Sequence, residues 1–460
     1  MNRSLLISLL TVAMGSAQAD PVDDFVTSSM AAQKIPAVVI GIVKDGKLVR
    51  KQAYGKIDLE LDVDAKPDDI YEIGSITKQF TAFATLLLAE QKKLSLNDSV
   101  DKYIDNCPEI WKPITIRHLL YQISGLPDYA FVPGLGIVGE FTKDQFLTTM
   151  AALPLDFKPG VTWAYSNTNY ALLGWVIEKA SGIPYPRFVE ENIFKPAGMT
   201  QTFFGDNATI RPRRAHGYMN NQGEIIRAIA GAGSIASDGS INSTVEDMAK
   251  WDALLHEHRL LSAESYALMW SPAKLNSGRQ RPYGTGWFLG DPSLPDYVGH
   301  GGNSSGYSAG FARYTKDGLS VIMLSNLYPV SGEQFCRTIA ELLEPSLRAK
   351  IPEEKPDPQK ERTQKIKAAV LTFAEGKQDS NCLEEEVLAP MRTQRAAMSP
   401  VWQTVRKLTE LKFAGETKQG KDTLLTYRLL TPDRNFTAYI LWSDHSKIAQ
   451  MTLKADPPKA

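Results

Sequence analysis

Ser75 and Lys78 form an S-x-x-K sequence at the start of an apolar helical pattern. On a helix, a serine and a lysine three positions apart lie on one face, one turn from each other. The amine can then orient and activate the hydroxyl, which is a weak nucleophile at neutral pH. Gly74 permits a tight entry into this helix. An apolar stripe at helical spacing follows: Ile76, Phe80, Phe83, Ala84, Leu87 and Leu88. The spacing therefore predicts a nucleophilic serine at the start of a half-buried helix.

A second S-x-x-K sequence runs from Ser271 to Lys274, so the tetrapeptide alone is not specific. Pro272 follows Ser271 at once, in a Pro/Gly/Ser-rich stretch that predicts a loop rather than a helix. We therefore expect only the first occurrence to carry chemistry.

Tyr165 and Asn167 form a Y-x-N sequence between Lys158-Pro159-Gly160 and an apolar helix predicted from Tyr170 to Ala180. A loop held by a rigid helix is a common way to present catalytic groups. A nearby lysine ammonium would favour the phenolate of Tyr165 and let it relay protons. Tyr218-Met219-Asn220 also matches Y-x-N. On its own, therefore, the tripeptide would indicate only a half-buried aromatic side chain beside a turn.

His300-Gly301-Gly302-Asn303 precedes a strand predicted from Ser308 to Tyr314. Consecutive glycines let a substrate approach the backbone closely, and backbone N–H groups along such an edge can bind a developing oxyanion. His300 adds a hydrogen-bond donor or a titratable group at the same edge. The alternative interpretation is a turn with an incidental histidine.

The elements that must position these residues form a sheet built from both ends of one domain, with a helical insert between them. A hairpin is predicted from Ala37 to Gln52, with its turn at Lys44 to Lys47. Residues 76–270 are mostly helical in pattern. Further strands are predicted at Gly286 to Leu289, Ser308 to Tyr314 and Leu319 to Ser325, and a helix at Gly332 to Leu347.

Composition changes at Lys350 to Gln359, where three prolines among charges predict a stiff, solvated linker. A helix follows from Thr363 to Ala374, and more helix is expected through Trp402. Four alternating strands are then predicted at Leu408 to Gly415, Thr423 to Leu430, Phe436 to Trp442 and Lys447 to Leu453. Helices followed by a meander indicate a small α+β domain. It holds no motif with chemistry, so we expect an accessory that packs on, or recognises, something that the sequence does not identify.

The 460-residue chain is long enough for at least two domains. Its net charge of −1 gives no electrostatic case for a nucleic-acid or anionic-membrane partner. A short basic start, an apolar run from Leu5 to Met14 and the Ala17-Gln18-Ala19 site predict a cleaved signal peptide. That run is too short to span a bilayer, so we expect a periplasmic or secreted protein with no integral membrane segment after cleavage.

Three cysteines, Cys107, Cys336 and Cys382, are too few for a disulfide framework, although one bridge is possible. His256-Glu257-His258 is expected to be the polar side of a surface helix rather than a metal site. Gly302 to Gly306 matches G-x-S-x-G, but a strand follows it where an α/β-hydrolase needs a helix. Arg211, Arg213 and Arg214 are expected on a solvated loop, and Asp238 and Asp247 are expected to cap or orient turns.

Together and in this order, the three motifs resemble the family of class C β-lactamases, penicillin-binding D,D-peptidases and related serine esterases. The resemblance covers roughly Phe25 to Leu343. Further segments carry it: Ile116 to Tyr129 (IRHLLYQISGLPDY), Phe157 to Tyr170 (FKPGVTWAYSNTNY), Ile193 to Thr200 (IFKPAGMT), Asp238 to Trp251 (DGSINSTVEDMAKW) and Tyr283 to Trp287 (YGTGW).

The resemblance implies an α/β (α+β) fold of the β-lactamase/transpeptidase type, with an antiparallel sheet flanked by helices and a helical subdomain. We expect a signal peptide at 1–19, the serine hydrolase domain at 20–349, a linker at 350–361 and a small α+β domain at 362–460.

The resemblance also implies roles for the site residues. Ser75 is then the acylated nucleophile, and Lys78 and Tyr165 share proton transfer. Asn167, His300, Gly301, Gly302 and Asn303 contribute to substrate binding, with the backbone N–H groups of Ser75 and Asn303 as the oxyanion hole. No metal or organic cofactor is implied.

One departure from the family pattern bears on the substrate. The β-lactamases and D,D-peptidases usually carry lysine-threonine-glycine where this chain has His300-Gly301-Gly302. The histidine form is familiar in the esterase and D-amino-acid peptidase branches. We therefore expect an exported hydrolase of an ester or a peptide-like amide, with a small-molecule or peptidoglycan-like substrate. The alternatives are a β-lactamase and a slowly acylated penicillin-binding sensor. Gln122-Ile123-Ser124 also replaces the usual histidine-threonine-serine, a change expected to alter only packing.

Overall fold

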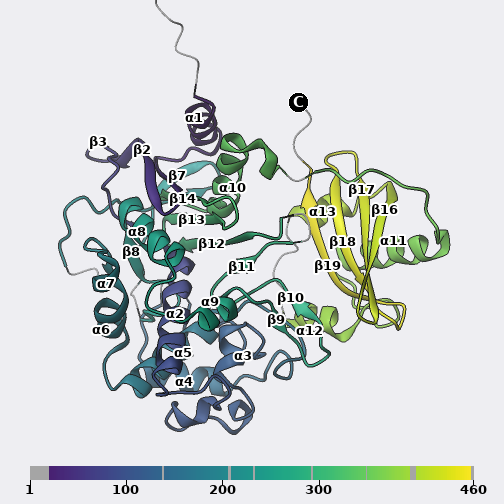
Figure 1. Cartoon of the computed structure of the whole chain (residues 1–460), viewed down its shortest axis with the longest axis horizontal. Coiled ribbons are helices and arrows are strands. Elements are labelled where there is room, and N and C mark those ends of the chain that lie inside the picture. Colours follow the sequence, from purple (N-terminus) through teal and green to yellow (C-terminus); the bar gives the residue numbers. More distant parts are fainter. Residues whose placement is uncertain are drawn as a thin grey trace, which may run out of the picture.

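The computed structural model describes residues 20–136, 139–205, 209–229, 231, 234–291, 294–348, 350–393 and 400–456. The predicted signal peptide, residues 1–19, lies outside them. Figure 1 shows a large body around a central sheet, with a smaller group of strands beside it near the C-terminus. Within the described ranges, no helix is both long and apolar enough to cross a bilayer.

Seven antiparallel strands form the central sheet, in the order β11-β12-β13-β14-β1-β2-β3. Strands that are distant in sequence are adjacent in it, because β1 pairs with β14 as well as with β2. The bounds are Ala37–Lys44 (β1), Lys47–Asp58 (β2), Val63–Asp64 (β3), Phe288–Leu289 (β11), Tyr297–Ser304 (β12), Tyr307–Tyr314 (β13) and Leu319–Ser325 (β14). The predicted hairpin and the strands that became β13 and β14 are confirmed.

Strand β12 is a difference from the sequence-based expectation. The His-Gly-Gly segment was placed ahead of a strand, and the structure places it inside one. Glycine disfavours strands, but here the backbone of β12 packs closely against the turn that carries Ser75. A Cβ atom on Gly302 would lie 1.8 Å from the carbonyl oxygen of Ile73. The glycine therefore serves close backbone approach rather than a turn.

The sheet is buried on both faces, as the alternation of β1 shows. Val38, Ile40 and Ile42 belong to one apolar cluster, with residues of α1 (Pro21–Gln33) and α10 (Gly332–Leu343). The intervening Ala37, Val39 and Val43 belong to the other cluster, with residues of α2 (Thr77–Glu90) and α8 (Val245–His256). Because successive strand residues point to opposite faces, a continuous apolar run suits a sheet between two helical layers.

The insert between the two groups of strands holds most of the helices. Helix α2 is central, and every residue from Thr77 to Leu86 is buried. Its Phe80 ring packs on Trp251 of α8, with ring centroids 4.4 Å apart. The other helices are α3 (Ile116–Leu120), α4 (Lys143–Ala151), α5 (Asn167–Ser181), α6 (Tyr185–Val189), α7 (Lys195–Ala197) and α9 (Ala263–Met269). Single-turn helices occur at Val100–Lys102, Glu109–Trp111, Tyr129–Phe131, Glu190–Phe194 and Pro345–Leu347.

The insert also contains short strands that the helical pattern did not predict. They are β4 (Tyr71–Glu72), β5 (Phe203–Phe204), β6 (Tyr218–Asn221), β7 (Glu224–Arg227), β8 (Ile241–Ser243), β9 (Ala273–Lys274) and β10 (Gln280–Arg281), and β15 (Leu327–Tyr328) pairs with β6. Strand β8 pairs with β5 and with β4, and β4 lies directly before Ser75 in the chain. This small sheet holds the segment that leads into α2.

The C-terminal part contains the predicted meander. Strands β16 (Glu410–Gln419), β17 (Asp422–Leu430), β18 (Phe436–Trp442) and β19 (Ile448–Ala455) pair in sequence order. The helices are α11 (Lys360–Ala374), α12 (Glu385–Thr393) and α13 (Pro400–Val405). Their buried apolar residues, Ile366 to Ile448, form a cluster of their own. We propose from this cluster that the C-terminal part is a separate domain within the expected range 362–460.

Candidate active site

Ser75 lies in a single turn of 3-10 helix, Gly74–Ile76, that runs directly into α2. Gly74 has φ +51, a conformation that favours glycine. A Cβ atom at Gly74 would lie 2.5 Å from the backbone nitrogen of Asn303 in β12. One at Gly302 would lie 3.2 Å from the backbone nitrogen of Ser75. The two glycines therefore bring the backbones of Ser75 and Asn303 together, although they are far apart in sequence.

Lys78 lies one helical turn after Ser75 and is fully buried. Its Nζ donates to Ser75 Oγ at 3.0 Å and to Asn167 Oδ1 at 2.7 Å. A third hydrogen bond, 2.7 Å long, runs to the backbone carbonyl of Asp238. Burial lowers the pKa of Lys78 to about 8, against the opposing effect of the Asp238 and Asp128 carboxylates. About a tenth of this lysine is therefore a neutral amine at pH 7, and about half at pH 8.

Asn167 is the first residue of α5, and its amide connects two groups of the site. Oδ1 accepts from Lys78, and Nδ2 donates to Asp128 Oδ2 at 3.1 Å. The sequence placed Asn167 on the loop before a helix starting near Tyr170; the helix begins earlier and includes it. The helix start therefore fixes the Asn167 backbone beside the lysine.

Tyr165 lies on the loop before α5, with its ring centre 5.0 Å from Lys78 Nζ. Its hydroxyl is buried and, among the described residues, has no partner in good hydrogen-bond geometry. Burial raises the pKa of Tyr165, and the neighbouring Ser75 hydroxyl offsets only part of that rise. The expectation that the lysine would favour the phenolate is wrong for this arrangement, because burial disfavours the charged form more strongly. Tyr165 is a neutral phenol here.

Gln122 holds the Tyr165 loop from behind, a role that the sequence did not reveal. It has φ +61. Its backbone carbonyl accepts from Ala164 N at 3.1 Å. Its Oε1 atom accepts from Ser166 N at 3.0 Å and from Asn169 Nδ2 at 2.5 Å. The residue that replaces the usual one at this position therefore supplies a side-chain amide that binds Ser166, directly after Tyr165, which is more than a change in packing.

His300 points from β12 into a cluster of aromatic side chains and is 2% exposed. Its ring centre lies 4.9 Å from that of Phe288 and 6.0 Å from that of Tyr165. The ring nitrogens lie 2.6 Å from the Gly301 carbonyl oxygen and 3.3 Å from the Tyr283 hydroxyl. Burial lowers the pKa of His300 to about 3, so the side chain is a neutral imidazole at ordinary pH. The sequence left two roles open for His300, a hydrogen-bond donor or a titratable group. Its low pKa excludes titration near neutral pH.

A cleft opens beside Ser75, and its lining includes Asn167, Asn303, Tyr129 and Asp238. Tyr129 donates to Asp238 Oδ2 at 2.7 Å, and burial raises the pKa of Asp238 to about 6. Sequence analysis assigned Asp238 only to turn structure and did not identify Tyr129. The available signal was that both residues lie in segments that resemble the family, Tyr129 in Ile116 to Tyr129 and Asp238 in Asp238 to Trp251.

The cleft also corrects the expectation for the arginine cluster. Arg214 lines the cleft together with Glu72, and the two side chains form an ion pair at 3.3 Å. The Arg214 side chain is only 19% exposed. Arg213 pairs with the fully buried Asp69. The segment is therefore not simply a solvated loop.

The competing motifs lie elsewhere or lack the required elements. Ser271 follows α9, and its Oγ lies 3.0 Å from the Tyr121 hydroxyl. Ser304 ends β12 and is followed by a turn and β13, not by a helix. His258 stacks on Tyr266 with ring centroids 4.5 Å apart. Over the ranges given above, no group of three or more potential metal ligands occurs, and all three cysteines are unpaired.

Comparison with known proteins gives a consistent result. A family model described as Beta-lactamase matches residues 22–343. Penicillin-binding protein 4* of Bacillus subtilis (strain 168) is 32% identical in an alignment 302 residues long, which covers 61% of this chain and 66% of that protein. The chain therefore covers slightly less than two thirds of that relative's length.

Solved structures show the same architecture. The octameric penicillin-binding protein homologue from Pyrococcus abyssi has a TM-score of 0.63 and 23% identity, over 94% of this chain and 99% of that one. A D-stereospecific amidohydrolase from Streptomyces sp. has a TM-score of 0.60 and 26% identity, over 69% of this chain and 96% of that one. The expected β-lactamase/transpeptidase type of fold is confirmed.

Proposed function

The chain belongs to the beta-lactamase family of serine hydrolases, and from that premise we propose that it cleaves an ester or a peptide-like amide through an acyl-enzyme on Ser75. The observation that carries the proposal is the contact of Lys78 Nζ with Ser75 Oγ at 3.0 Å, made by a buried amine whose pKa is about 8. A neutral amine in that place can accept the serine proton when the hydroxyl attacks.

In the first half of the proposed reaction, Ser75 Oγ bonds to the substrate carbonyl carbon and its proton passes to Lys78. The carbonyl oxygen becomes an oxyanion, which the backbone N–H groups of Ser75 and Asn303 stabilise. The bond to the leaving group then breaks. Tyr165 gives its proton to the leaving group and regains one from the Lys78 ammonium, so that neither side chain is changed overall.

In the second half, water attacks the acyl-enzyme. Its proton passes to the same pair of side chains, and Ser75 Oγ leaves with a proton as the acid product departs. Tyr165 acts here as a neutral phenol that relays protons, because burial raises its pKa. Asn167 is placed to bind the substrate near its acyl side, since it lines the cleft and contacts Lys78.

The neutral His300 favours an ester, or an amide with no carboxylate beside the scissile bond, over a β-lactam. By family resemblance, the usual lysine at this position helps to hold the substrate carboxylate, and a buried imidazole with a pKa of about 3 carries no charge for that purpose. The similarity to a D-stereospecific amidohydrolase points the same way. A D-amino-acid amide, or a D-amino-acid peptide with no free carboxylate beside the scissile bond, is therefore the peptide-like substrate that we propose.

A panel of substrates tests this function. We expect the purified protein to turn over p-nitrophenyl esters or D-alanyl peptides many times per molecule, and nitrocefin far more slowly. Nitrocefin as the best substrate would instead favour the β-lactamase alternative. Labelling of one equivalent of protein without turnover would favour the sensor alternative. The matched L-alanyl peptides serve as the control for stereochemistry.

We also propose that the protein is exported after cleavage at Ala19. The next residue, Asp20, is already part of the folded protein: its carboxylate caps α1 by accepting from Val22 N at 2.8 Å and pairs with Arg50 at 2.7 Å. N-terminal sequencing of the protein from an expressing bacterium is expected to give a chain that starts at Asp20. A retained Met1 would contradict the proposal.

A further inference from the structure

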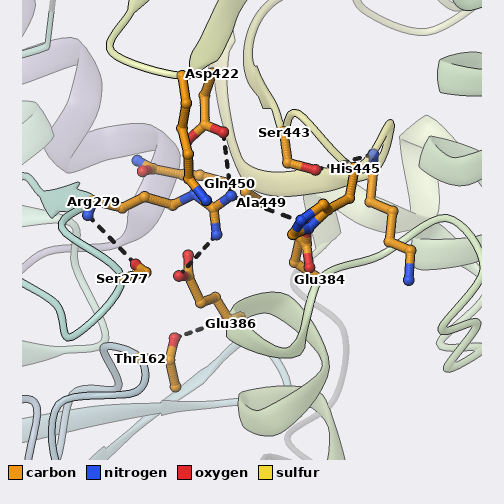
Figure 2. Close-up of polar contacts among 12 residues, drawn as sticks. Thr162, Ser277, Arg279, Glu384, Glu386, Asp422, Ser443, His445, Ala449 and Gln450 are labelled. Atoms are coloured by element: carbon orange, nitrogen blue, oxygen red, sulfur yellow. Dashed lines mark hydrogen bonds and ion pairs between the residues drawn. The ribbon is translucent and has the colours of Figure 1, made fainter.

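Glu386, in the C-terminal part, contacts the part of the chain that holds Ser75 at two places (Figure 2). Its backbone carbonyl accepts from Thr162 Oγ1 at 2.6 Å. Its carboxylate lies between two arginines of the β9–β10 hairpin: Oε1 accepts from Arg279 Nη1 at 3.0 Å, and Oε2 accepts from Arg281 Nη2 at 2.8 Å. Glu386 is 8% exposed and Thr162 is 1% exposed. These contacts are therefore inside the protein and not on its surface.

Glu386 belongs to a cluster of largely buried charged side chains. Arg279 also forms a two-point contact with Asp422, at 2.8 and 3.2 Å, and Figure 2 shows its guanidinium between the two carboxylates. Arg281 donates in addition to Gln450 Oε1 at 2.8 Å and to the Ala449 carbonyl at 3.0 Å. Arg279 Nη2 also lies 4.0 Å from Glu384 Oε1, so two arginines face three carboxylates with little solvent. Breaking a buried pair of this kind leaves an uncompensated charge, so the contact fixes the position of both partners.

The first route from Glu386 to the active site is short. Thr162 lies three residues before Tyr165, on the same loop. The start of that loop is held by Asn276, whose backbone N donates to the Gly160 carbonyl at 2.8 Å. Gln122 holds its other end, beyond Tyr165. Thr162 is therefore the point at which the C-terminal part fixes the middle of the loop.

The second route runs through the hairpin. Arg281 lies two residues before Tyr283, whose backbone N donates to the Arg281 carbonyl at 2.8 Å. The Tyr283 ring packs edge to face against Tyr165, with centroids 6.4 Å apart, and its hydroxyl lies 3.3 Å from His300 Nε2. A shift of the hairpin would therefore change the packing around the Tyr165 ring.

We propose that Glu386 is a positioning residue for Tyr165, so that the C-terminal part sets the geometry of proton transfer in the active site. Glu386 touches no reacting atom. It fixes the loop before Tyr165 through Thr162 and the aromatic neighbour of Tyr165 through Arg281. The inference rests on the proposed function of Tyr165 as a proton relay, in which a misplacement of about 1 Å costs as much as roughly 10²-fold in rate.

The test is a double-mutant cycle on the full-length protein. The readout is the rate at which an alkyl ester labels Ser75, measured as the alcohol released in the first turnover: Oγ bonds to the acyl carbon, and the alkoxide leaves with the proton of Tyr165. Glu386→Gln keeps the shape of the side chain and removes its charge, and we expect a loss of roughly tenfold in labelling rate and in kcat, with KM for an ester unchanged. In a Tyr165→Phe background, the same change is expected to cost almost nothing, because its effect passes through the missing hydroxyl.

Asp456→Asn is the matched control. Asp456 pairs with the buried Arg428 inside the C-terminal part, with an Oδ1–Nη1 distance of 2.6 Å, and none of its contacts reaches the Tyr165 loop. It should lower the melting temperature without changing the labelling rate. Thr162→Val supplies a second variant that leaves the ion pairs intact and removes only the bond to the Glu386 carbonyl, and it is expected to slow labelling in the same direction.

Equal losses for Glu386→Gln with and without the Tyr165 hydroxyl would overturn the inference, because a merely structural effect would appear in both backgrounds. An independent readout is hydrogen exchange at the Ala164 and Ser166 amides, which should be faster in Glu386→Gln than in Asp456→Asn. Equal exchange in the two variants would also overturn it. A wild-type protein without labelling or turnover would refute the proposed function, and the exchange measurement would then decide the inference alone.

Discussion

Replacing Ser75 by alanine is expected to lower both fluorophosphonate labelling and ester turnover by roughly 10⁴-fold or more, because the substitution removes the atom that forms the acyl bond. Binding of the substrate should survive, since Asn167, Asn303 and the cleft remain in place. The measurement is the rate of labelling, followed by intact-protein mass, beside the rate of ester hydrolysis. The folded state should be retained, because alanine fits the turn that serine occupies.

The chain supplies a matched control in its second S-x-x-K sequence. Ser271→Ala removes a serine hydroxyl that lies 3.0 Å from the Tyr121 hydroxyl and donates to the Leu268 carbonyl at 2.8 Å. Its lysine partner in the motif, Lys274, is exposed in β9. Ser271→Ala should therefore label and hydrolyse like the wild type. Persistent labelling of Ser75→Ala, or its loss in Ser271→Ala, would contradict the assignment of the nucleophile.

Much of the fold could be predicted because the relevant signals are local. Alternation and turn residues identified the β1–β2 hairpin, the strands β13 and β14 and the C-terminal meander. The apolar stripe after Ser75 identified α2. Strand β12 had no such signal, since its glycines disfavour a strand in isolation. They are explained by the close approach of Gly302 to Ile73, which joins two segments distant in sequence.

The residues of the candidate site could also be predicted from the sequence, but their protonation states could not. Residue type and spacing pointed to Ser75 and Lys78, the resemblance to a family added Tyr165, and the structure brings the three together. The sequence suggested a phenolate at Tyr165 and left open whether His300 is a hydrogen-bond donor or a titratable group. Burial decides both cases, by raising the pKa of Tyr165 and lowering that of His300 to about 3. Burial depends on the packing of distant segments, so no local pattern reports it.

The residues that support the site had the weakest signals. Thr162 and Glu386 are 224 positions apart, and nothing in either neighbourhood indicates that they meet. Gln122 appeared only as a departure from a family pattern, although its side chain binds the backbone next to Tyr165. Such contacts are set by the docking of one element on another. They are therefore visible only once the tertiary structure is known.

Replacing Lys78 by methionine is expected to slow acylation by roughly 10²–10⁴-fold, the usual contribution of a positioned base. Methionine is unbranched and of similar length, so it fills the same buried space without the amine. It leaves the Asn167 and Asp238 oxygens without their donor, and the melting temperature should therefore be measured beside the rate. Lys78→Arg keeps the positive charge but stays protonated, so it is expected to be slow as well.

The pH profile separates loss of a base from loss of structure. Because burial lowers the pKa of Lys78 to about 8, the fraction of free amine rises with pH up to that point and then levels off. The acylation rate of the wild type should accordingly rise about tenfold per pH unit below about pH 8 and reach a plateau above it. This rise with pH should be absent in Lys78→Met, and a rise that persists there would show that another group is the base.

A change at Asp238 tests whether Lys78 is the group whose titration produces the rise with pH. Its carboxylate raises the pKa of Lys78, in opposition to the larger effect of burial. Asp238→Asn removes that charge and keeps the backbone carbonyl that accepts from Lys78 Nζ at 2.7 Å. The midpoint of the rise in acylation rate should therefore move below pH 8, because a weaker base loses its proton at lower pH. A midpoint that moves upward, or follows His300→Gln instead, would assign the titration to a different group.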